Sequence, residues 1–95
     1  MEYNAEATGE KYRDIAKAMG VEGVDAMSLK DARKAAVAAV KQLSEDVGIP
    51  KTLRGIVKEE DLDFLAQSAM DDACRPGNPK DPTKEDIVAL YRSLL

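Results

Sequence analysis

The chain has 95 residues and a formal net charge of −4 at neutral pH. Because an acidic protein has little means of neutralising phosphates, we expect neither nucleic acid nor an anionic membrane surface as its partner. It contains no histidine, which removes the most common metal ligand and the most common general base at neutral pH. Its single cysteine cannot form an internal disulfide, and this favours a reducing compartment such as the cytoplasm. No apolar run approaches the roughly 20 residues that a membrane-spanning helix needs.

A first amphipathic helix is predicted over residues 9–19. Four apolar residues follow the i, i+3, i+4, i+7 spacing of one helical face: Tyr12, Ile15, Ala16 and Met19. We expect Thr8 to be the N-cap of this helix and Gly20 to end it. Residues 1–8 and 21–27 carry no helical pattern and are interpreted as irregular.

The longest predicted helix runs from Ser28, its expected N-cap, to Val47, where Gly48 and Pro50 would end it. Its main apolar stripe consists of Leu29, Ala32, Ala36, Val40, Leu43 and Val47. Residues 35–40 are apolar on every face, whereas a helix with one solvated side has a polar face. Three short partner helices cannot cover such a segment completely. We therefore expect at least one of Val37, Val40 or their neighbours to stay exposed in this chain.

Two further helices are predicted after a connector at residues 51–58. The third begins at the acidic run 59–61 and buries Leu62, Leu65, Ala66, Ala69 and Ala73. A stiff, proline-rich turn at residues 74–82 follows it. The fourth begins with a capping box at Thr83 and presents Ile87, Leu90, Tyr91 and Leu94 on one face. No segment alternates with period two, so the predicted fold is all-α, an irregular array of four helices.

The carboxylates offer no convincing catalytic or metal site. Asp71 and Asp72 are adjacent on a predicted helix, so their side chains point about 100° apart and do not converge on one atom. The acidic residues at 59–63 are typical of a favourable first helical turn, and without histidine or calcium-loop spacing they do not predict a metal site.

Cys74 and Ser28 are the two candidate nucleophilic or modified residues. Cys74 lies at a predicted helix C-terminus after two aspartates, an environment that disfavours a thiolate, so a neutral, packed thiol is favoured over a reactive one. Ser28 opens a helix in a small acidic helical chain, as the modified serine of acyl-carrier proteins does. The residue before it is Met27, not aspartate, and helix capping explains Ser28 without further assumption.

Four stretches, spread over nearly the whole chain, carry a family resemblance. In order they are Tyr3-Asn4 with Thr8 to Ala16; Met19-Gly20-Val21; Asp46 to Pro50 with Leu53-Arg54; and Asp71 to Cys74 with Gly77-Asn78-Pro79, Glu85-Asp86-Ile87 and Leu90-Tyr91. Their order and spacing resemble the C-terminal helical region of the iron-containing (group III) alcohol dehydrogenases, in the branch that is lactaldehyde reductase-like.

The resemblance implies a parent enzyme several times longer than this chain. Such an enzyme has an α/β domain that binds NAD(P) and a larger helical domain that holds a divalent iron through one aspartate and three histidines. It interconverts small alcohols and aldehydes or ketones by hydride transfer, with the iron acting as a Lewis acid. None of these ligands carries over to a chain without histidine, and no Gly-rich cofactor loop is present.

We therefore interpret residues 1–95 as the C-terminal part of that helical domain, without the metal ligands and without the dinucleotide-binding domain. The chain alone is expected to be inert and structural, with no catalytic, cofactor or metal residue of its own and with the remainder of its enzyme as partner. Cys74 is the one residue that the resemblance implies near the substrate cleft, as part of its wall. Self-association through the exposed apolar helix is a second expectation, and a free-standing helical interaction module or an acyl-carrier-like protein are the alternatives.

Overall fold

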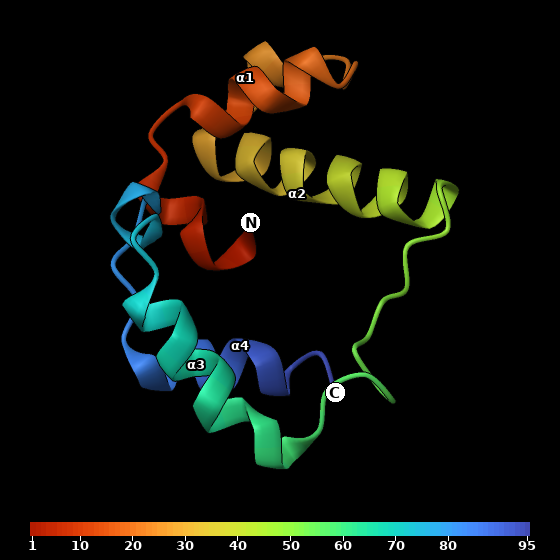
Figure 1. Ribbon diagram of the computed structural model, residues 1–95. Helices are drawn as coiled ribbons and strands as arrows, with labels where there is room; N and C mark the ends of the chain where they lie inside the picture. Colours follow the sequence, from red (N-terminus) through yellow and green to blue (C-terminus); the bar gives the residue numbers. More distant parts are fainter. The chain divides into compact units, whose positions relative to one another are not determined.

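The computed structural model describes all 95 residues and divides into two compact units, residues 1–49 and 50–95 (Figure 1). Four α-helices confirm the all-α prediction: α1 (Lys11–Ala18), α2 (Leu29–Asp46), α3 (Leu62–Asp71) and α4 (Lys84–Arg92). Four short 3-10 helices accompany them: η1 (Glu2–Ala7), η2 (Val24–Ala26), η3 (Glu59–Asp61) and η4 (Arg75–Gly77). There is no strand, and no helix is both long and apolar enough to cross a bilayer.

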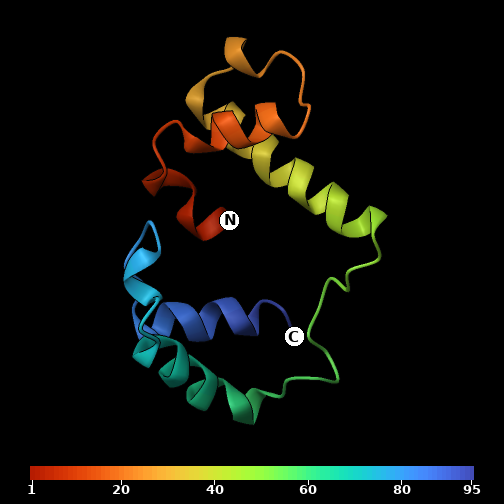
Figure 2. The same cartoon turned by 45° about the horizontal axis from the view of Figure 1, so that its top comes forward.

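The first unit is built on the packing of α1 against α2, with η2 touching both helices (Figure 2). Its buried cluster consists of Tyr12, Ala16, Val24, Ala32 and Ala36. Three of these five side chains are alanines, so the two helices can approach closely but each contact buries little apolar area. The stability of this unit therefore depends strongly on its polar contacts and helix caps.

Local sequence rules place both ends of α2 correctly. The Ser28 hydroxyl accepts a hydrogen bond from the Asp31 N–H at 3.1 Å, which confirms the predicted N-cap. At the other end Gly48 has φ +78°, and the N–H of Ile49 donates to the Ser44 carbonyl at 2.9 Å. These are the features of a Schellman motif, in which a glycine takes the left-handed conformation that other residues avoid.

The predicted start of the first helix is wrong. Thr8 is not its N-cap, because its side chain is buried and its hydroxyl donates to the Ala5 carbonyl at 2.8 Å. Its carbonyl accepts from the Lys11 N–H, so the helix begins two residues later, with Glu10 as N-cap. Residues 1–8 are also not irregular, since they contain η1, and the Tyr12 hydroxyl holds this segment by donating to the Met1 carbonyl at 2.8 Å. Within residues 21–27, η2 likewise forms a short 3-10 turn.

The alanine-rich part of α2 is only partly covered, as predicted. Within residues 35–40 only Ala36 is buried, Ala38 is exposed, and the other four residues are partly exposed. The apolar stripe becomes more exposed toward the C-terminus of the helix, where Leu43 is 52% and Val47 63% exposed. The stripe is therefore a core element at its beginning and a surface at its end.

The second unit is built on α3 and α4, with η3 and η4 touching α3. Leu62 and Ala66 are buried, whereas Leu65 and Ala69 are only partly buried. The predicted burial of Ala73 is wrong, because α3 ends at Asp71 and Ala73 lies exposed in the turn that follows. No residue of α4 is fully buried, since this helix packs against a single helix.

Capping and backbone hydrogen bonds fix the start of α4 and the connector. The predicted capping box at α4 is confirmed, with the Thr83 hydroxyl accepting from the Asp86 N–H and the Asp86 carboxylate accepting from the Thr83 N–H, both at 3.1 Å. The connector carries one short turn, in which the Val57 N–H donates to the Leu53 carbonyl. The Leu53 N–H itself donates to the Leu94 carbonyl at 2.8 Å and ties the connector to the chain end.

Candidate functional site

The turn between α3 and α4 contains Cys74, the one residue that the resemblance implies near a substrate cleft. Its thiol is free and exposed, so the prediction of a packed thiol is wrong. The Cys74 N–H donates to the Asp72 carboxylate at 2.7 Å, which makes Asp72 a turn-forming residue. The Cys74 carbonyl accepts from the Gly77 N–H at 3.0 Å, so the backbone of Cys74 is part of the turn.

Arg75 organises this turn, which sequence reasoning missed. Its Nε donates to the Met70 carbonyl at the end of α3, at 3.0 Å, and its Nη1 forms an ion pair with Asp81. Arg75, Pro76, Asn78 and Asp81 line an open hollow of about 260 Å³. The Asn78 amide donates to the Lys80 carbonyl and so helps to form the turn. Cys74 does not line the hollow.

The paired carboxylates at the end of α3 do not act together. Asp71 accepts a hydrogen bond from the Gln67 amide at 3.0 Å, while Asp72 accepts from the backbone of the turn. Each carboxylate has its own partner and both residues are exposed, in agreement with the expectation that the two side chains do not converge on one atom.

The acidic residues around η3 also have separate partners. Asp61 accepts from the Lys58 N–H at 2.9 Å, Asp63 pairs with Lys84 at 2.8 Å, and Glu59 pairs with Arg92. No group of three or more histidine, cysteine, aspartate or glutamate side chains is placed to hold a metal ion. The residues of this chain therefore do not fit an iron centre.

The pair between Glu59 and Arg92 predicts a pH dependence of stability. The hydrogen bond from Arg92 lowers the pKa of the Glu59 carboxyl. A carboxyl whose pKa is lower in the folded state stabilises that state above its unfolded pKa, about 4.3, and this contribution is lost as the pH falls through the folded pKa. We expect Glu59→Gln to flatten the decline of the urea midpoint below about pH 4.3. Both side chains are largely exposed, so the change should be small and should shrink with added salt.

Glu60→Gln is the matched control. Glu60 lies beside Glu59 in the chain, and its carboxylate forms an ion pair with the Lys58 ammonium at 3.8 Å. Urea titrations of the two variants and the parent between about pH 3 and pH 6 make the comparison. Equal acid slopes for all three proteins would contradict the assigned role of the Glu59–Arg92 pair.

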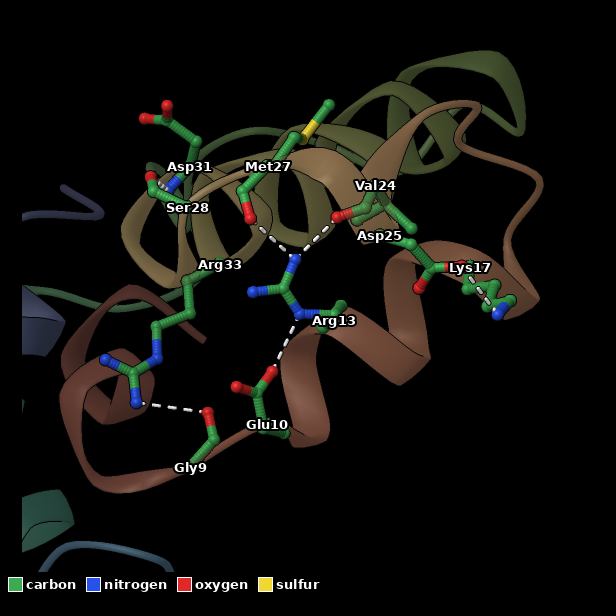
Figure 3. Close-up of polar contacts among 10 residues, drawn as sticks. All are labelled: Gly9, Glu10, Arg13, Lys17, Val24, Asp25, Met27, Ser28, Asp31 and Arg33. Atoms are coloured by element: carbon green, nitrogen blue, oxygen red, sulfur yellow. Dashed lines mark hydrogen bonds and ion pairs between the residues drawn. The ribbon is translucent and has the colours of Figure 1, made fainter.

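The first unit contains a second polar cluster, at the junction of α1, η2 and α2 (Figure 3). Arg13 Nη1 donates to the carbonyls of Val24 and Met27 at 2.6 and 2.8 Å, and its Nε donates to Glu10 at 2.7 Å. Arg13 thereby joins α1 to both ends of η2. Its side chain is only 17% exposed, so these bonds form in a partly dehydrated environment.

Two other basic residues lie in the same region. Lys17 pairs with Asp25 at 2.8 Å, and the hydrogen bond between them raises the pKa of Lys17 and lowers that of Asp25. Arg33 donates to the Gly9 carbonyl at 3.0 Å, while its Nε is buried without a hydrogen-bond partner (Figure 3). All three basic residues of this cluster therefore connect segments of the chain.

Ser28 has a local structural explanation. Its hydroxyl accepts the hydrogen bond of the α2 N-cap, as Figure 3 shows. A serine capping a helix is expected at this position without any modification. The structure adds no feature that supports the acyl-carrier alternative.

These contacts define a helical region whose polar groups cap helices and hold loops in place. Residues 1–95, the whole chain, match the description "Fe-containing alcohol dehydrogenase family, C-terminal". The chain belongs to the Fe-containing alcohol dehydrogenase family and corresponds to its C-terminal region. The family resemblance carried by the four sequence stretches is thereby confirmed.

Curated relatives and solved structures agree with this assignment. The chain is 58% identical to lactaldehyde reductase of Escherichia coli K12 over 94 residues, which cover 98% of this chain and 24% of the relative. It is 41% identical to 1,3-propanediol dehydrogenase of Klebsiella pneumoniae over 91 residues, or 95% of this chain and 23% of the relative. A crystal structure of 1,3-propanediol oxidoreductase matches with a TM-score of 0.91 and 39% identity, over 99% of this chain and 25% of that one. The chain thus spans about a quarter of the length of the relatives it matches.

Proposed function

We propose that this chain is the C-terminal part of the helical domain of an NAD(P)- and iron-dependent alcohol dehydrogenase. The whole enzyme interconverts small alcohols and aldehydes or ketones by hydride transfer, in the cytoplasm. The observation that carries the proposal is the family match over all 95 residues, together with 58% identity to lactaldehyde reductase. The identity to 1,3-propanediol dehydrogenase is lower, at 41%, which favours a lactaldehyde reductase-like parent.

In this proposal the chain itself contributes structure. Its side chains do not fit an iron site, so the metal and the dinucleotide are bound by parts of the enzyme that its relatives carry beyond the matched region. The chain packs behind the metal-bearing helices, and the turn that Arg75 organises contributes to one wall of the substrate cleft. Cys74, exposed on that turn, is the wall residue proposed.

A chimera tests the proposal. The 94 matched residues of Escherichia coli lactaldehyde reductase are replaced by the corresponding residues of this chain. Because 58% of those positions already agree, we expect the chimera to fold and to reduce lactaldehyde with NADH or NADPH in the presence of ferrous iron. The isolated 95-residue chain, assayed in the same way, should show no turnover above a control without protein.

The intact lactaldehyde reductase is the reference for both measurements. A chimera that folds, as judged by circular dichroism and gel filtration, but lacks activity would contradict the proposal. Turnover by the isolated chain would contradict the assignment of the chemistry to the remainder of the enzyme.

A further inference from the structure

The end of α2 presents an apolar surface that nothing in its unit covers. We call it the α2 docking face and define it by Val40, Leu43, Val47 and Ile49. Leu43 is 52%, Val47 63% and Ile49 57% exposed, and Val40 is partly exposed. Isolated exposed apolar residues are normal on a protein surface, but a set at helical spacing is typical of an interface.

This face continues the stripe that forms the core of the first unit. Leu43 and Val47 follow the buried Ala36 by seven and eleven residues, which brings them to the same side of the helix. The partner helix ends too early to cover them, because α1 has 8 residues and α2 has 18. At 1.5 Å per residue these lengths are about 12 Å and about 27 Å. Figures 1 and 2 both show α2 extending well past α1.

The polar neighbours of the face indicate the chemistry of what covers it. Lys41 pairs with Glu2, and the Gln42 amide donates to Asp46 at 2.8 Å. Since these groups are engaged with residues of this chain, what the face itself offers to a partner is its apolar side chains. An apolar surface of the partner suits it, and a charged one does not.

We propose that the α2 docking face packs against an apolar segment of the same enzyme that lies outside these 95 residues. This inference rests on the proposed function, because the relatives have about four times the length of this chain and the remainder supplies the covering segment. A second copy of the chain is less well supported. Four side chains at one helix end offer much less than the roughly 800 Å² that each partner buries in a stable complex.

The test compares the same substitutions in two contexts. Leu43→Lys and Val47→Lys are introduced together into the isolated chain and into the lactaldehyde reductase chimera. Both residues are exposed in the chain, so its thermal midpoint should change by no more than about 3 °C. In the chimera the lysines would be buried without a partner, so its midpoint should fall by at least about 6 °C. Lys34→Glu is the control, because Lys34 is an exposed, already charged residue on the opposite side of the same helix, and it should shift neither protein.

Each other outcome overturns the inference. An unchanged midpoint of the double variant in the chimera means that the face is solvated in the whole enzyme. A fall in the isolated chain means that this chain itself covers the face. A dimer of the isolated chain that the double variant dissociates, seen by gel filtration, identifies a second copy as the occupant. The readout is stability, so an active chimera with an unchanged midpoint refutes this inference and leaves the proposed function intact.

Discussion

Leu62→Ala is expected to destabilise the second unit by about 2–5 kcal/mol, the usual cost of removing a buried leucine side chain. Leu62 is 2% exposed and is the largest fully buried side chain of the chain. The only other buried residue of α3 is Ala66, and α4 has none. The cavity left by Leu62 would therefore remove most of a small core. We expect loss of helical circular dichroism from this unit at a clearly lower urea concentration.

Phe64→Ala is the matched control for this prediction. Phe64 lies two residues further along the same helix and is 73% exposed, so its truncation should change stability by no more than about 0.5 kcal/mol. A larger side chain is removed in the control than in the test variant. Equal urea midpoints for the two variants would therefore show that α3 does not bury the face described here.

Helix ends were predictable from the sequence because they depend on neighbours along the chain. The Ser28 hydroxyl accepts a hydrogen bond from the Asp31 N–H three residues later, and the Thr83 hydroxyl accepts one from the Asp86 N–H in the same way. Gly48 ends α2 for an equally local reason, its positive φ. The same reasoning failed at Thr8, whose hydroxyl bonds backward to Ala5 within a 3-10 helix that apolar spacing does not reveal.

Burial was less predictable, since it depends on which helix lies opposite. Leu43 and Leu62 both belong to well-spaced apolar stripes, yet Leu43 is 52% and Leu62 2% exposed. The sequence shows the apolar stripe, but it does not show which helix packs against the stripe or how much of it that helix covers. The failure at Ala73 has a different cause, because α3 ends two residues before it.

The polar contacts that hold the loops were the least predictable feature. Arg75 reaches Met70 and Asp81 across a proline-rich turn, and only the nearby acidic residue could have suggested such a contact. Cys74 lies in the predicted turn, but its exposure was not evident from its place after two aspartates. Backbone carbonyls, the acceptors in several of these contacts, have no signature in a sequence.

Arg13→Met is the second prediction with a large expected effect. Methionine keeps much of the aliphatic length of arginine but removes the donors that reach Val24, Met27 and Glu10. A hydrogen bond from a charged donor contributes about 1.5–3 kcal/mol, and partial hydration of the freed carbonyls returns some of it. We therefore expect a net loss on the order of 2–3 kcal/mol from the first unit, measured by urea unfolding.

Lys17→Met separates this effect from the loss of a surface ion pair. Lys17 also connects α1 to η2, through Asp25, but its side chain is 63% exposed where that of Arg13 is 17% exposed. An exposed ion pair contributes about 0–1 kcal/mol, so Lys17→Met should cost much less than Arg13→Met. Equal losses would mean that only charge attraction holds the loop. A much larger loss for Arg13→Met is the result expected if its guanidinium satisfies carbonyls that water reaches poorly, in a unit whose core is largely alanine.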